Sequence, residues 1–226
     1  MDLQLAGRVV LVVGGTGLIG SAVVERLRAE GAVAVAASRS GRGGAVLDAR
    51  DDASVSTGIS TLLDEHGRLD GVVVAAAPSA QTLDPARSSD PRQVLEAVDA
   101  KALGFLRVAN AALPVMTDSS YGRIVGVAGQ NAFVTGNVAG SVRNAALIIA
   151  AKNLADSVAG TGVTVNTVSP GTVREEPTRQ VQSAQAGETR PSEVAALIAF
   201  LVSPIAGAIS GESIAVGHRV RGVTSM

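Results

Sequence analysis

A glycine-rich turn near the start of the chain has the spacing that cradles phosphate groups. Gly14, Gly17 and Gly20 directly follow the apolar run Arg8–Val13 and open an expected helix, Gly17–Glu30. The first glycine permits a tight turn, the second lets a pyrophosphate approach the backbone, and the third lets the helix pack against the strand. Free amides at the helix N-terminus would bind the phosphates. A strand–helix turn that binds no ligand is the alternative.

The end of the next apolar run, Ala32–Ser38, would select the dinucleotide. An acid at this position binds a ribose 2′-hydroxyl, whereas an arginine accommodates a 2′-phosphate. The chain has Ser38, Arg39 and Arg42 here, without an acid. Because a guanidinium binds phosphate through paired hydrogen bonds, we expect NADP(H) in preference to NAD(H). The alternative is a pair of solvated arginines and no bound cofactor.

The elements that position these residues alternate along the whole chain. Short runs that are apolar at consecutive positions are typical of parallel strands covered on both faces, and helical patterns separate them. The alternation predicts a Rossmann-type α/β fold, a doubly wound parallel sheet of about seven strands with helices on both faces, in a single domain over residues 1–226. The expected strands are Arg8–Val13, Ala32–Ser38, Ala45–Asp48, Gly71–Ala77, Arg123–Ala128, Val163–Ser169 and Glu212–Val216, and the expected helices are Gly17–Glu30, Asp52–His66, Pro91–Met116, Val138–Gly160 and Ser192–Ser203.

A polar stretch, residues 171–190, departs from this alternation. It lies between the sixth strand and the last helix, where a segment could cover a cleft. We expect either a short lid or an ordinary solvated loop. Its polar residues are Arg174, Glu175, Glu176, Arg179, Gln180, Gln182, Gln185 and Glu188.

The composition argues against several classes of protein. The chain has no cysteine, so disulfides and thiolate sites are excluded, and its two histidines stand apart from clustered acids, so we expect no metal site. A net charge of −1 argues against a nucleic-acid partner. No apolar run is long enough to span a membrane, and no signal peptide is recognisable. We expect a cytoplasmic protein that acts on a small molecule.

These motifs resemble the short-chain dehydrogenase/reductase family over nearly the whole chain. The segments Leu47–Ala49, Asn166–Gly171 and Ile209–Glu212 are similar to segments of that family, as is the glycine turn. The resemblance implies a nicotinamide cofactor and the reduction of a carbonyl or the oxidation of an alcohol. The candidate cofactor-binding residues are Gly14, Thr16, Gly17, Leu18, Ile19, Ser38, Arg39, Asp48, Ala49, Ala75, Ala76, Pro170, Gly171 and Val173.

Self-association is expected on two grounds. The helices expected at Pro91–Met116 and Val138–Gly160 are rich in alanine and apolar around much of their circumference, so each must bury a second face. Members of the family that the chain resembles usually pair these two helices across a twofold axis. We therefore expect a homodimer or a homotetramer.

The catalytic residues of that family are absent at the aligned positions. Its serine aligns with Gly129, its tyrosine with Gly140, its lysine with Asn144 and its asparagine with Lys101. The only tyrosine, Tyr121, precedes the fifth strand, so no alignment produces a Tyr-x-x-x-Lys motif. The chain is thus expected to be a divergent member without the Ser/Tyr/Lys chemistry.

Two of these positions suggest a compensating chemistry. The family's lysine and asparagine stand exchanged, with Lys101 on the earlier helix and Asn144 on the later one. If both helices line the cleft, Lys101 would supply a proton or an electrophilic contact to the substrate, and Asn144 would position it. The alternative is a Lys101 that extends to solvent or pairs with Asp99. Glu175, after the Pro-Gly pair at 170–171, is expected to place a carboxylate near the pyrophosphate.

Three functions therefore remain open. The first is an NADP(H)-dependent oxidoreductase that works on a small carbonyl or alcohol without the tyrosine–lysine relay. The second is a non-redox enzyme, such as a cyclase, isomerase or lyase, that uses the same cleft as a shaping pocket. The third is a catalytically silent binding or regulatory protein. Fold alone does not choose among them.

Overall fold

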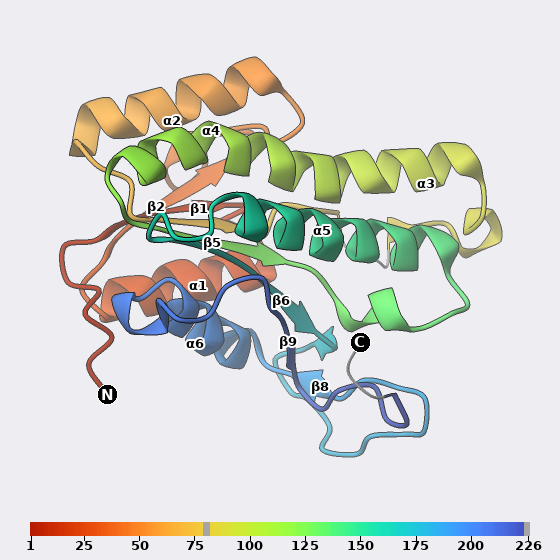
Figure 1. Ribbon diagram of the computed structural model, residues 1–226. Coiled ribbons are helices and arrows are strands. Elements are labelled where there is room, and N and C mark those ends of the chain that lie inside the picture. The colour runs from red at the N-terminus through yellow and green to blue at the C-terminus, as the bar shows by residue number, and fades with distance from the viewer. Residues whose placement is uncertain (79–81, 224–226) are drawn as a thin grey trace.

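The computed structural model describes residues 1–78 and 82–223. A seven-stranded parallel sheet with the order β3-β2-β1-β4-β5-β6-β9 forms its centre, and this confirms the expected fold class (Figure 1). The strand order reverses between β1 and β4. The strands are β1 (Val9–Val13), β2 (Val33–Ser38), β3 (Ala45–Val46), β4 (Gly71–Val74), β5 (Gly122–Val127), β6 (Val163–Pro170) and β9 (Ser213–Val216), and the α-helices are α1 (Leu18–Ala29), α2 (Asp52–His66), α3 (Pro91–Val98), α4 (Gly104–Asp118), α5 (Val138–Ser157) and α6 (Pro191–Leu201).

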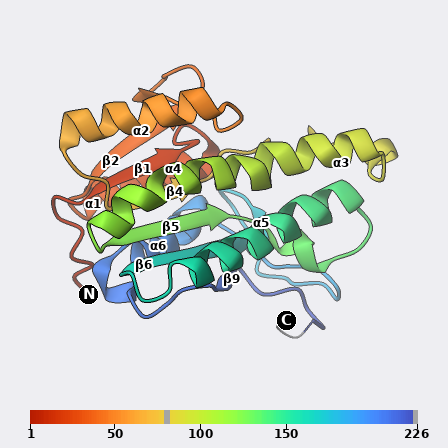
Figure 2. The same cartoon turned by 45° about the horizontal axis from the view of Figure 1, so that its top comes forward.

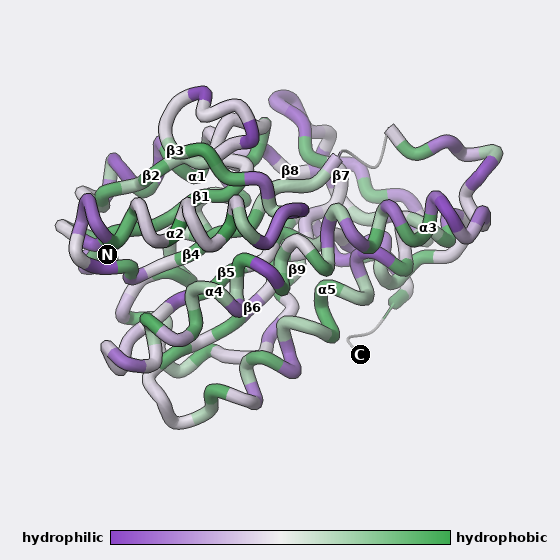
Figure 3. The backbone as a smooth tube through the Cα atoms, turned by 90° about the horizontal axis from the view of Figure 1, so that it is seen from above, coloured by the Kyte–Doolittle hydropathy of each residue, from purple (hydrophilic) through white to green (hydrophobic). Residues whose placement is uncertain are grey.

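Both faces of the sheet are covered, which explains why its strands are apolar at consecutive positions. In β1, Val9, Leu11 and Val13 enter one core, and Val10 and Val12 enter the other. The first core lies under α2, α4 and α5, and the second lies under α1 and α6 (Figure 2). Figure 3 shows the same pattern, since the central strands β1, β4 and β5 are hydrophobic along most of their length.

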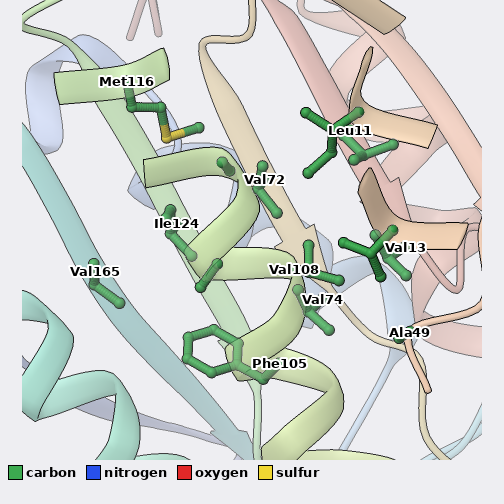
Figure 4. Close-up of a cluster of buried hydrophobic side chains, with 14 of the residues drawn as sticks. Leu11, Val13, Ala49, Val72, Val74, Phe105, Val108, Met116, Ile124 and Val165 are labelled. Carbon is green, nitrogen blue, oxygen red and sulfur yellow. The ribbon is translucent and has the colours of Figure 1, made fainter. Parts of the chain in front are cut away.

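The helix α4 seals the first core where it crosses the middle of the sheet. Phe105, Val108 and Met116 on α4 are fully buried, and they pack over β4 and β5 (Figure 4). Fixing α4 in this way also fixes the turn that precedes it, and that turn carries Lys101.

The helix expected over Pro91–Met116 is interrupted in the structure. Helices α3 and α4 are joined by a π-helical turn, Asp99–Leu103. A π turn adds a residue to one turn of helix and so changes which side chains face inward, and such turns are frequent at functional sites. A regular apolar repeat gives no signal for it, so the sequence pattern missed the interruption.

A polar cluster closes the amino-terminal edge of the sheet. The Asp70 carboxylate accepts hydrogen bonds from Arg8 and Arg68, at 2.6 to 2.8 Å, and from a backbone amide of β1. The guanidinium groups of Arg8 and Arg123 lie 4.3 and 4.4 Å from the centre of the Tyr121 ring. The only tyrosine is therefore held at the edge opposite the glycine turn.

The polar stretch 171–190 contains a second, two-stranded parallel sheet. Its strands are β7 (Thr172–Val173) and β8 (Glu188–Thr189), and Arg174 pairs with Glu188 at 2.9 Å. Backbone hydrogen bonds from residues 184 and 187 tie the stretch to the C-terminal segment. In Figure 1 it lies beside that segment, below the carboxyl end of β6. Within the described ranges, no helix combines the length and hydropathy needed to cross a bilayer.

Candidate functional site

A cavity of about 630 Å³ opens at the carboxyl ends of the central strands. Its wall includes residues that follow β1, β4, β5 and β6, so it lies in the crevice where open parallel sheets bind ligands. A second cavity, of about 430 Å³, lies between α2 and α4 and does not include the glycine turn. The polar side chains on the wall of the larger cavity include Lys101, Gln130, Asn131, Arg143, Asn144 and Gln185.

The glycine turn has the shape that a bound pyrophosphate requires. A Cβ on Gly14 would lie 2.7 Å from the Ala76 nitrogen, and one on Gly20 would lie 2.1 Å from the Gly14 oxygen. A Cβ on Gly17 would come no nearer than 3.4 Å to other atoms, so this glycine keeps open the space in front of α1. No side chain caps the N-terminus of α1. Its first amides therefore remain available to an anionic ligand.

The structure divides the predicted cofactor-binding residues into two groups. Seven line the cavity, and the other seven do not. Arg39 is exposed beyond the end of β2, and Glu175 is exposed and does not line the cavity. The lining group is Gly17, Leu18, Ile19, Ala75, Pro170, Gly171 and Val173, and the remaining group is Gly14, Thr16, Ser38, Arg39, Asp48, Ala49 and Ala76.

Lys101 is buried in the cavity wall and does not extend to solvent. The side chain is 8% exposed, and its Nζ donates a hydrogen bond of 3.0 Å to the Ala128 oxygen, just beyond β5. Asp99 instead accepts hydrogen bonds from Arg50 and Arg107, at 3.0 and 2.8 Å. The alternative of a solvated or Asp99-paired lysine is therefore wrong.

The surroundings of Lys101 favour its neutral form. Burial, and then the positive charge of Arg143, lower the pKa of the Lys101 ammonium to about 7. An amine with a pKa near 7 both gives and accepts protons readily at neutral pH. Lys101 thus has the properties of a general acid or base at the end of β5.

The side chains of an asparagine pair, Asn131 and Asn144, fill the space beside Gly129 and Gly140, the positions that align with the family's serine and tyrosine. Asn144 Nδ2 donates to Asn131 Oδ1 at 2.6 Å and to the Gly140 oxygen at 2.8 Å. A Cβ on Gly129 would lie 3.0 Å from Asn131 Oδ1, and one on Gly140 would lie 3.1 Å from Asn131 Nδ2. Larger side chains at these two positions would therefore collide with the Asn131 amide.

Three polar residues of the site were not singled out from the sequence. Asn131 follows the fifth strand, where an asparagine also suits an ordinary turn. Gln130 is buried and holds the C-terminal segment. Its Nε2 donates hydrogen bonds to the Val216 and His218 oxygens, and its Oε1 accepts one from the Val220 amide. Arg143 stands in an alanine-rich helix beside Asn144. A positively charged residue in an otherwise small and apolar helix was the one sequence signal that could have identified Arg143.

Metal chemistry has no visible support in the site. Within residues 1–78 and 82–223, no three His, Cys, Asp or Glu side chains gather as metal ligands. The chemically useful groups on the cavity wall are an amine, a guanidinium and carboxamides. Such groups move protons, bind anions and donate hydrogen bonds.

Comparisons with known proteins find relatives over nearly the whole chain. A family model described as Enoyl-(Acyl carrier protein) reductase matches residues 14–218. The chain is 30% identical over 245 residues to the 3-oxoacyl-[acyl-carrier-protein] reductase FabG of Vibrio harveyi, covering 94% of this chain and 96% of that protein. It is also 30% identical over 244 residues to D-threitol dehydrogenase of Mycolicibacterium smegmatis, covering 95% and 93%.

Solved structures share the fold. A ribose-5-phosphate isomerase from Brucella melitensis 16M superposes with a TM-score of 0.84 at 25% identity, covering 96% of this chain and 93% of that one. A levodione reductase superposes with a TM-score of 0.83 at 22% identity, covering 95% and 97%.

Replacing the buried lysine should stabilise the protein. We expect Lys101→Met to raise the free energy of unfolding at pH 7 by about 2 kcal/mol, because the folded state no longer buries a cation. Since the unfolded chain binds the additional proton between pH 7 and about 10, the gain should shrink as the pH rises through that window. Urea unfolding at pH 7 and pH 9.5 measures both effects.

Lys152→Met is the matched control, since Lys152 lies exposed on α5 and pairs with Asp156. It should change the free energy of unfolding by less than about 1 kcal/mol. In protein carrying ¹³C-labelled lysine, one of the two Cε signals should titrate near pH 7 and vanish in Lys101→Met. A destabilised Lys101→Met protein, or no such titration, would contradict the assignment.

Proposed function

Because the chain belongs to the short-chain dehydrogenase/reductase family, we propose that it is an NADP(H)-dependent oxidoreductase of the cytoplasm in which Lys101 transfers the proton. Its substrate is a small carbonyl compound or the corresponding alcohol. The observation that carries the proposal is the buried Lys101 amine on the wall of the cavity that begins at the glycine turn. The relatives support the redox class, since they are a reductase and a dehydrogenase.

The cofactor would lie along the carboxyl edge of the sheet. Gly17, Leu18 and Ile19 would hold its pyrophosphate with the first amides of α1, and Arg39 would meet the 2′-phosphate that distinguishes NADP(H). Leu18 is 53% exposed at the cavity, as suits an apolar contact with a bound ring. When bound, the nicotinamide supplies or accepts the hydride.

Lys101 would handle the proton that accompanies hydride transfer. In the direction of reduction, the Lys101 ammonium donates its proton to the oxygen of the carbonyl carbon and becomes a neutral amine. In the direction of oxidation, the neutral amine accepts the hydroxyl proton. The hydrogen bond to the Ala128 oxygen fixes the amine at the end of β5 in either state.

The asparagine pair would orient the reacting oxygen in place of the family's serine and tyrosine. Asn144 Nδ2 donates a hydrogen bond to Asn131 Oδ1 and so fixes the Asn131 amide. Asn131 lies in the cavity wall, and its Nδ2 is at the other end of that amide. That amide N–H is a suitable donor to a carbonyl oxygen. Asn144 is thus a positioning residue, and the usual tyrosine–lysine relay is not used.

A non-redox isomerase is the second candidate. One structure with this fold, at 25% identity, is described as a ribose-5-phosphate isomerase, and an isomerisation between a ketone and an aldehyde also needs a side chain that transfers a proton, a role for which the Lys101 amine is suited. The two candidates are separated by an assay for the oxidation of NADPH, in which the absorbance at 340 nm is measured in the presence of carbonyl compounds. An oxidoreductase lowers this absorbance, and an isomerase does not.

We further propose that α3 and α5 pair with a second copy of the chain and that residues 171–190 act as a lid. Leu95 on α3 and Ile149 on α5 are 67% and 62% exposed, which is unusual for large apolar side chains on helices packed together. Residues 184–186 of the polar stretch line the cavity from outside the sheet.

The glycine turn can be tested by nucleotide binding. NADPH should raise the melting temperature of the wild-type protein more than NADH does. Gly17→Ala should weaken NADPH binding at least tenfold and leave the melting temperature of the unliganded protein unchanged, because its Cβ has room in the fold but occupies the space of the pyrophosphate. Thermal shift and calorimetric titration provide the two measurements.

Arg39→Gln should weaken NADPH binding and leave NADH binding unchanged, whereas Arg92→Gln, an exposed site on α3, should change neither. If neither nucleotide shifts the melting temperature of the wild-type protein, the oxidoreductase proposal fails.

The proton role predicts a pH profile. With the reduction of a carbonyl as the assay, kcat should be maximal below about pH 7 and fall as the pH rises further, because the donor is the protonated form of Lys101. In the oxidation direction the profile should reverse. Lys101→Met should lower kcat by about 10²–10⁴-fold in both directions without weakening NADPH binding. A Lys101→Met enzyme with wild-type kcat would contradict the role.

The pairing of helices predicts self-association. The wild-type protein should sediment as a dimer or tetramer, and Ile149→Glu should shift it toward the monomer because a buried carboxylate has no partner in an apolar interface. Val46→Glu, at an exposed position on the edge strand β3, should leave the mass unchanged. A monomeric wild-type protein would rule out the proposed pairing.

A further inference from the structure

A buried arginine in the cavity wall has no acidic partner. Arg143 on α5 is 3% exposed, and its Nη1 atom donates one hydrogen bond, of 3.0 Å, to the Pro78 oxygen. Its Nε atom is buried without a hydrogen-bond partner. In the part of the chain that the structure describes, no carboxylate pairs with this guanidinium, although Arg143 carries a permanent positive charge.

Arg143 lies close enough to Lys101 for its charge to lower the pKa of the Lys101 ammonium. The charge of Arg143 is the second cause, after burial, of the lowered pKa of Lys101, and burial also lowers the pKa of Arg143 itself. The two cations therefore repel each other inside one cavity wall. A buried charge without a partner destabilises the fold.

No aspartate or glutamate stands among the described residues of the cavity wall. The acid nearest to Lys101 along the chain is Asp99, and its carboxylate already accepts hydrogen bonds from Arg50 and Arg107. The opposite edge of the sheet differs, because there the Asp70 carboxylate pairs with Arg8 and Arg68. The cavity thus holds positive charge that its own wall leaves uncompensated.

We propose that the substrate of this cavity carries a carboxylate, which Arg143 binds and which compensates the charge of Arg143. This inference rests on the proposed function, because it names the class of carbonyl compound that the site reduces: a small oxo acid. The glycine turn, which follows β1, takes the phosphates of the cofactor, whereas Arg143 meets the loop after β4. The two anionic groups would therefore bind at different strand ends.

A carboxylate fits better than a phosphate ester. A carboxylate carries one negative charge, and Arg143 supplies one permanent positive charge. A phosphate dianion would require Lys101 to remain fully protonated, and Lys101 could then not release its proton during the reaction. The planar carboxylate also matches the parallel N–H donors of a guanidinium.

The test compares oxo acids with their neutral amides in binding to the wild-type protein without nucleotide. The probes are pyruvate, acetoacetate and levulinate, each beside its carboxamide, so that the distance between carbonyl and carboxylate varies. By calorimetric titration, at least one acid should bind ten times more tightly than its amide. Equal binding of acid and amide at all three lengths would overturn the proposal.

Variants then assign the effect to Arg143. Arg143→Gln should abolish the preference for the acid and leave NADPH affinity unchanged, and Arg143→Lys should keep part of the preference. The control, Arg92→Gln, should keep all of it. If Arg143→Gln weakens the binding of NADPH as strongly as the binding of the oxo acid, Arg143 contacts the nucleotide and the proposal fails. Because the comparison of acid with amide needs only wild-type protein, a variant that does not fold leaves the test intact.

A further binding measurement with a phosphate ester distinguishes a site for carboxylates from a site for phosphates. Dihydroxyacetone phosphate should bind more weakly than the best oxo acid, and tighter binding would overturn the assignment to a carboxylate. Failure of the oxidoreductase proposal is recognised separately, by the absence of NADPH binding, while the preference for the acid over the amide is measured without nucleotide.

Discussion

Burial of the parallel sheet on both faces is the constraint from which the rest of the structure follows. Successive residues of β1 enter opposite cores, so a polar side chain has no place along the strand. The charged groups that the strands and their turns carry consequently gather at the two edges where the central strands begin and end. At the amino edge, Asp70, backbone carbonyls and the Tyr121 ring satisfy the arginines. At the carboxyl edge, Lys101 and Arg143 have no aspartate or glutamate beside them among the described residues of the cavity wall.

Two parts of the carboxyl edge are held in place by different kinds of contact. The glycine turn is fixed by backbone contacts, since side chains on Gly14 or Gly20 would meet the main chain at less than 3 Å. Beyond β5, the wall depends on side-chain contacts, in which Asn131 occupies the space above Gly129 and Gly140. A substitution in the glycine turn therefore has to displace backbone, whereas a substitution beyond β5 has to displace side chains.

The position of Lys101 illustrates how a destabilising group can be retained. Its burial lowers its pKa to about 7, which costs stability in the fold but matches the requirement of a proton donor at neutral pH. The same reasoning applies to Arg143, whose charge is buried without an acid among the described residues. Functional sites commonly concentrate such groups, because the ligand provides the compensation that the protein lacks.

The sequence alone determined the fold class, the glycine turn and the absence of a Tyr-x-x-x-Lys motif. These features depend on local spacing and on residue identity, which a sequence records directly: consecutive apolar residues require a sheet covered on both faces, and one tyrosine before the fifth strand cannot reach the cleft. The sequence also named Lys101 and Asn144, but only through a resemblance, and it could not decide whether Lys101 was solvated.

Tertiary structure decided the environment of those side chains. The π turn that carries Lys101 leads into α4, which packs over the sheet, and no periodic pattern in the sequence indicates the turn. The partners of Lys101, Asn144 and Arg143 come from β5, the loop after it and the loop after β4, which are distant in the chain. Charge compensation and pKa depend on these long-range neighbours and on burial, so they become visible only when the chain is folded.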